Sequence, residues 1–135
     1  MGCGAARPLV DRSDIASTIE TEHAAVLEAV EACADAVYDT WEGTAVSDPE
    51  RVGPPLRHCL EVGGTLEALA AVLEGLLDQP PRAPVVPAPP YVVVTSRGPM
   101  LRATVPGGRL VVLLQVFAVA DGTYHRCPLT VEVDY

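Results

Sequence analysis

The spacing of apolar residues along the chain changes near residue 78. From Asp14 to Glu42 apolar residues recur at every third or fourth position, which predicts one long amphipathic helix. Residues 54–78 keep a helical spacing but are apolar or small on almost every side, which predicts a second, more buried helix. The pair Gly63–Gly64 leaves open whether this second helix is continuous. The apolar stripe of the first helix comprises Ile15, Ile19, Val26, Val30, Cys33 and Val37, with Trp41 at its edge.

A proline-rich tract follows the second helix. Residues 79–90 contain six prolines in twelve positions, and an extended polyproline conformation would make them roughly 37 Å long. We interpret the tract as a stiff surface strap within one domain, with a linker between separable units as the alternative. The domain then comprises a flexible N-terminus (1–12), an acidic helical half (13–78), the strap (79–90) and a sheet half (91–135).

The sheet half is rich in Val, Thr, Tyr and Phe, the residues that favour strands. We expect strands at 91–96, 100–105, 109–120 and 129–135, with hairpin turns at Arg97–Gly98 and Gly107–Gly108. Helices followed by a run of hairpin strands are typical of an α+β fold. We therefore predict two antiparallel helices packed on one face of a four-stranded antiparallel β-meander.

The two turns predict which side chains share a face of the sheet. One face is wholly apolar and is expected to pack on the helices. The other is mixed, and two helices cannot cover both faces of the sheet, so we expect an exposed patch that binds a protein partner or a second copy of the chain. The alternative is that the N-terminus or the strap folds over it. The candidate interface residues are Tyr91, Val93, Met100, Arg102, Leu113 and Phe117.

The polar stretch TSRGP, residues 95–99, is the most site-like loop in the chain. An anion cradle needs converging backbone N–H groups, usually at a helix N-terminus. Here strands flank the loop, and Pro99 lacks an N–H group. The stretch is therefore better explained as a hairpin turn.

Charge is distributed unevenly between the halves. The chain has 18 acidic residues against 9 arginines and no lysine, and 15 of the acids lie between Asp11 and Asp78. This excess excludes the basic surface that general nucleic-acid binding requires. Codon usage in a GC-rich genome explains the missing lysine, but it leaves the acid excess unexplained. We therefore favour a salt-adapted host, in which salt screens an acidic coat.

Cellular location is predicted from two further features. The longest apolar stretch, Leu110 to Ala120, has 11 residues, which is too short to span a membrane, and no signal peptide precedes it. The four cysteines are scattered without a CxxC pair, and Cys33 and Cys59 fall on apolar helix faces. We expect reduced cysteines and a cytoplasmic protein.

Motifs for catalysis and cofactor binding are missing from the sequence: it has no GxSxG, P-loop, HExxH or GxGxxG. The stretches RHC (57–59) and HRC (125–127) together offer two histidines and two cysteines, but their spacing is too close for zinc. We predict no catalytic, metal or cofactor site and a non-catalytic role. The alternative is a domain that binds or converts an anionic metabolite through Arg97, Arg102, His125 and Arg126.

The chain has a characteristic overall pattern. It is carried by the stretches TIETEHAAVLEAVEACADAVYDTWEG and PYVVVTSRGPMLRATV, with GGRLVVLLQVFAV after them. In this short, acidic, lysine-free pattern the chain resembles the uncharacterised small proteins of haloarchaea. Such proteins have no assigned activity, so the resemblance implies a domain of unknown function and assigns no functional residue.

Overall fold

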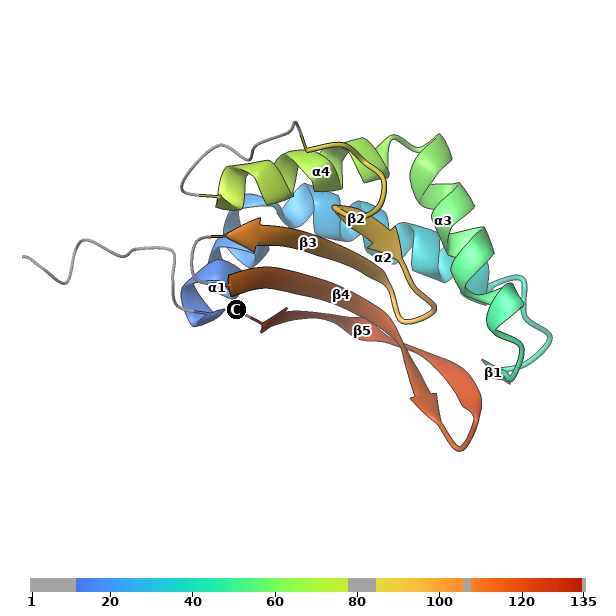
Figure 1. The fold of residues 1–135 in the computed structure, drawn as a ribbon. Helices are drawn as coiled ribbons and strands as arrows, with labels where there is room; N and C mark the ends of the chain where they lie inside the picture. Colours follow the sequence, from blue (N-terminus) through green and yellow to red (C-terminus); the bar gives the residue numbers. More distant parts are fainter. Residues whose placement is uncertain (1–11, 78–84, 106–107, 135) are drawn as a thin grey trace, which may run out of the picture.

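Four α-helices pack on one face of a five-stranded antiparallel sheet in the computed structural model, which describes residues 12–77, 85–105 and 108–134 (Figure 1). The α+β class is therefore confirmed. Residues 1–11 of the expected flexible N-terminus and residues 79–84 of the strap lie outside the described residues. The helical elements are α1 (Arg12–Glu22), α2 (Ala24–Tyr38), the 3-10 helix η2 (Pro49–Arg51), α3 (Gly53–Val62) and α4 (Thr65–Leu76). The strands are β1 (Ala45–Val46), β2 (Val92–Val94), β3 (Pro99–Val105), β4 (Gly108–Ala120) and β5 (Thr123–Asp134).

The expected first helix is two helices, because the chain breaks at His23, whose φ and ψ are −124° and 30°. The apolar stripe nevertheless serves both of them: Ile15 and Ile19 of α1 and Val30 of α2 are buried in one core. The break lets α1 contact β5 while α2 packs across β4 and β5. Since the break involves no glycine or proline, the sequence pattern does not reveal it.

The expected second helix is also divided, and here the glycines mark the place. Gly64 has a φ of 75°, in the left-handed region that favours glycine, and it separates α3 from α4. Leu56 of α3 and Leu69 of α4 are both fully buried. The prediction of two helices is therefore wrong, and four shorter ones form the layer.

The disulfide Cys33–Cys59 joins α2 to α3. The two cysteines lie on apolar helix faces as expected, but those faces meet, and this contact brings the sulfur atoms together. The expectation that they stay reduced is wrong in this structure. The cytoplasmic location loses the support that it drew from them, because disulfides are rare in that compartment.

The sheet has the strand order β1-β5-β4-β3-β2, with one strand more than predicted. The extra strand, β1, comes from a segment expected to be a loop and pairs with the beginning of β5. Strand β5 also begins six residues earlier than predicted, at Thr123. Asp121 and Gly122, with φ values of 52° and 76°, form the tight turn from which β4 and β5 extend.

The pairing register differs from the predicted one by two residues. Val92 pairs with Leu101, and Leu101 pairs with Val112, whereas the predicted turns place Leu101 opposite Val94 and Leu114. Because side chains alternate between faces with a period of two, this shift leaves every side chain before the bulge on its predicted face. Leu101, Val112 and Leu114 accordingly lie in the core.

A β-bulge in β4 moves Phe117 from its predicted face. The amides of Val116 and Phe117 both donate to the carbonyl oxygen of Arg97, at 2.8 and 3.0 Å, and between Gln115 and Phe117 two steps along β4 match four steps along β5. The ring of Phe117 is fully buried, with its centroid 5.5 Å from that of Trp41. Phe117 therefore belongs to the core, and the interface role expected for it does not fit its position.

Candidate functional site

The face of the sheet that points away from the helices is the candidate interaction surface. We call it the open face. The register places Met100 and Arg102 of β3 beside Leu113 and Val111 of β4, and these beside Glu132 and Asp134 of β5. Its members are Tyr91, Val93, Met100, Arg102, Thr104, Arg109, Val111, Leu113, Gln115, Thr130, Glu132 and Asp134.

Five of the six predicted interface residues lie on this face: Tyr91, Val93, Met100, Arg102 and Leu113. All five are half-buried. Their neighbours in the sheet shield part of each side chain, and the four α-helices of the described residues lie on the opposite face of the sheet (Figure 1). The middle strands β3 and β4 therefore carry the apolar side chains Met100, Val111 and Leu113 beside polar ones, Arg102 among them.

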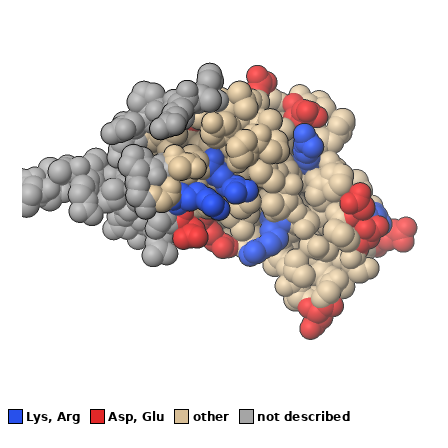
Figure 2. Space-filling view, viewed as in Figure 1, with Lys and Arg blue, Asp and Glu red and all other residues tan. Residues whose placement is uncertain are grey.

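The charges of the open face are separated by strand. Arg102 and Arg109 lie on β3 and β4, whereas Glu132 and Asp134 lie on β5. Figure 2 shows arginine side chains over the sheet, with carboxylates beside them at one margin. The described residues form no intramolecular ion pair between these groups. The face thus presents unpaired charges of both signs beside an apolar strip.

A shallow hollow of about 410 Å³ marks the end of the open face next to the β3–β4 connection. It is lined by Thr104, Gly108, Arg109, Val111 and Asp134. A second open hollow, of about 510 Å³, lies beside α3 and is lined by Gly53, Pro54, Arg57, His58, Glu61 and Val94. The hollow beside α3 has Glu61, Arg57 and His58 on its lining, but no ion pair joins these side chains among the described residues.

The loop of residues 95–98 is a hairpin turn whose N–H groups are used internally. The Oγ1 atom of Thr95 accepts hydrogen bonds from the amides of Arg97 and Gly98, at 3.1 and 3.2 Å, and donates to the Gly98 carbonyl oxygen at 2.8 Å. Those amides are therefore not free to hold an anion. The carbonyl oxygen of Arg97 is also used within the protein, because it accepts hydrogen bonds from the amides of Val116 and Phe117.

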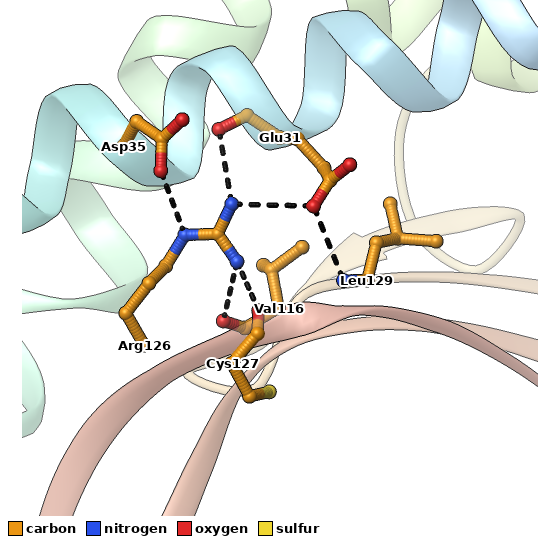
Figure 3. Close-up of polar contacts among 6 residues, drawn as sticks. All are labelled: Glu31, Asp35, Val116, Arg126, Cys127 and Leu129. Atoms are coloured by element: carbon orange, nitrogen blue, oxygen red, sulfur yellow. Dashed lines mark hydrogen bonds and ion pairs between the residues drawn. The ribbon is translucent and has the colours of Figure 1, made fainter.

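Arg126 ties the sheet to α2 (Figure 3). Its Nε atom donates to Asp35 Oδ1 at 3.1 Å, and a terminal nitrogen donates to Glu31, at 3.4 Å from both Oε1 and the backbone oxygen. The other terminal nitrogen donates to the carbonyl oxygens of Val116 and Cys127 beside the bulge. Since the side chain is only 14 % exposed, the guanidinium is committed to the fold.

The four residues of the alternative anion site are not brought together. Arg126 lies on the helix side of the sheet, whereas Arg102 lies on the open face. His125 pairs with Ala118, which is seven residues, or roughly 23 Å, along β4 from the partner of Arg102. Arg97 donates to Gln115 Oε1 at 3.2 Å in the hairpin turn.

The cysteine and histidine residues offer no metal site or activated thiol in the described part of the chain. No group of three or more metal-ligating side chains occurs there, and Cys59 is bonded to Cys33. Burial raises the pKa of the Cys127 thiol, while the nearby charges of Arg126 and Arg97 oppose that change. A raised pKa disfavours the thiolate, which is the nucleophilic form.

Comparison with known proteins identifies a family for almost the whole chain. The model of the family described as Domain of unknown function (DUF7988) matches residues 13–134. No curated protein and no solved structure matches the chain. Among the described residues, no helix is both long and apolar enough to cross a bilayer.

Proposed function

The chain belongs to the DUF7988 family, and we propose that it acts as a non-catalytic interaction domain that self-associates through the open face of its sheet. The observation that carries the proposal is the strip of half-buried apolar residues on β3 and β4, with Arg102 among them, which no helix of the described residues covers. Apolar patches of this kind on a folded domain usually mark protein contacts. Arginine, methionine and aromatic residues are enriched in the centres of such contacts.

The alternative, recognition of an anionic metabolite, has less support. Its four residues lie on different faces and at different ends of the sheet, and Arg126 is neutralised by Glu31 and Asp35. The turn amides that an anion would need are bonded to Thr95. These positions therefore support association through the open face better than they support a single pocket for an anionic ligand.

The acidic helices fit a protein that works in concentrated salt, and we include this in the proposal. Asp14, Glu20, Glu28, Asp39 and Glu42 are all exposed, so their mutual repulsion is screened when the ionic strength rises. Association through the open face does not depend on this feature, because the acids of α1 and α2 lie on the other side of the sheet.

Sedimentation equilibrium tests self-association directly. The wild-type chain, with a mass of 14.2 kDa, should show a concentration-dependent increase toward twice that mass in both dilute and molar KCl. Val111→Asp should shift the equilibrium to monomer. Val62→Asp is the matched control, because Val62 is 73 % exposed on α3, away from the open face. A wild-type chain that stays monomeric up to about 1 mM, a concentration at which even weak complexes form, would refute the proposal.

A further inference from the structure

The register of the sheet places opposite charges on either side of β4. Arg102 of β3 pairs with Val111 of β4, and Val111 pairs with Asp134 of β5. Adjacent strands are about 4.8 Å apart, so the two charged residues lie at equal distances from Val111 and about 9.6 Å from each other. Within one chain, the described residues form no ion pair between them. In the next row Leu113 lies between Met100 and Glu132.

From this arrangement we infer that two copies of the chain pack open face to open face about a two-fold axis that runs along β4, with Arg102 of each copy bound to Asp134 of the other. The inference rests on the proposed self-association and specifies its geometry. A two-fold axis along β4 sets β4 against its own copy and β3 against the partner's β5. Val111 and Leu113 then meet their own copies at the centre.

The charge of Arg102 selects this axis over the other ways of stacking the two faces. A two-fold axis perpendicular to the strands, at the level of Arg102, would place the two Arg102 side chains against each other. An axis between β3 and β4 would cover Arg102 with Val111 and leave its charge buried without a partner, which is costly. Of these three axes, the axis along β4 is the one that gives Arg102 and Asp134 a partner. It also sets Arg109 opposite its own copy and Glu132 opposite Met100 of the partner subunit, but Arg109 and Glu132 are both exposed, so their side chains can stay in solvent.

The contact is small by the standards of stable dimers. Three strands about 4.8 Å apart and about seven residues long give each copy a footprint of roughly 350 Å². Interfaces of this size belong to the weak, transient class. We therefore expect a dissociation constant between about 1 μM and 1 mM, with rapid exchange between copies.

Complementary charge reversals test the geometry. Arg102→Glu and Asp134→Arg, each alone, should weaken self-association at least tenfold, because each homodimer would then contain two like-charge contacts. An equimolar mixture of the two variants should associate at the wild-type level, because each pair in the mixed dimer is again opposite in sign. Arg57→Glu, on an exposed arginine of α3, is the matched control and should behave as wild type.

The outcomes separate the inference from the proposed function. If the wild-type chain is monomeric, both fail. If it associates and Val111→Asp disrupts it, but the two charge-reversal variants do not complement each other in the mixture, the face is correct and the axis along β4 is wrong. Restored association in the mixture supports both.

Cross-linking provides a second test that does not depend on altered charges. Packed sheets lie about 10 Å apart, too far for a direct disulfide, so a short bismaleimide is the appropriate reagent. In a background with Cys3→Ser and Cys127→Ser, Leu113→Cys should cross-link to its own copy, because Leu113 lies on the axis. Glu132→Cys, which faces Met100 of the partner, should not. Equal cross-linking at both positions would overturn the axis.

Discussion

Replacing Gly98 with alanine should be among the most destabilising single substitutions in the sheet. Gly98 has a φ of 149°, and a Cβ atom built on it would overlap the backbone carbonyl oxygen of Leu114. This oxygen belongs to β4 in the core and cannot move aside as a flexible side chain could. The loop would have to withdraw from β4, and its withdrawal would separate the carbonyl of Arg97 from the bulge amides of Val116 and Phe117.

The magnitude follows from these two effects. Holding a non-glycine residue in a sparsely populated conformation costs about 1–3 kcal/mol. Each buried amide left without an acceptor costs about 1–3 kcal/mol more. We expect Gly98→Ala to lower the free energy of unfolding by roughly 3–9 kcal/mol, a large part of the 5–15 kcal/mol typical of a domain.

Urea unfolding, followed by circular dichroism, measures this change. Gly43→Ala is the matched control, because nothing lies within 4 Å of a Cβ atom built there and its φ is not in the positive range. It should change the free energy of unfolding by less than about 1 kcal/mol. A loss at Gly98 no larger than the change at Gly43 would refute the role assigned to the close approach of the loop to β4.

Four further predictions follow from the other contacts. Arg126→Ala should lower the free energy of unfolding, measured in urea, by about 2–4 kcal/mol, because the carbonyl oxygens beside the bulge lose their donor and two carboxylates lose their ion-pair partner. Arg97→Ala, on the exposed loop, is the control and should lower it far less. Reducing Cys33–Cys59, whose sequence separation is 26, should lower the stability by about 3.5 kcal/mol, and Cys33→Ser should be insensitive to reductant. In a Cys3→Ser variant, alkylation of Cys127 by iodoacetamide should reach its half-maximal rate at a higher pH than that of a free thiol, because its raised pKa keeps the thiol protonated as the pH rises; a midpoint below that of a model thiol would contradict this. The unfolding midpoint should rise between low and molar KCl, and an unchanged midpoint would remove the argument for salt adaptation.

The face of each strand could be predicted from the sequence more securely than the pairing of individual residues. The turn at Arg97–Gly98 was placed correctly, but the hydroxyl of Thr95 caps a longer loop of four residues and moves the register by two. A shift of two preserves the face, so Met100, Arg102 and Leu113 were assigned to the open face for a sound reason. A shift of one would have reversed them all.

Of the features that differ from the expected fold, one has a signal in the sequence and the others have none. Asp121–Gly122 is a strong hairpin signal, and it explains why β5 begins at Thr123. The break at His23 has no such marker. The disulfide depends on which faces of α2 and α3 meet, and the spacing of Cys33 and Cys59 along the chain does not contain that information.

The bulge determines how far the open face extends. By turning Val116 and Phe117 both toward the core, it reverses the alternation along the rest of β4. Phe117 pairs with Arg126, so the same reversal directs Arg126 to the helix side, where it reaches α2. Phe117 and Arg126 belong to residue types that are enriched in binding surfaces, but here Phe117 packs in the core and Arg126 binds α2. The apolar strip ends before the bulge, and among the described residues the row of Arg102, Val111 and Asp134 is the one that places opposite charges symmetrically about β4. Specificity of self-association should therefore depend on this row, and the affinity on Val111 and Leu113 beside it.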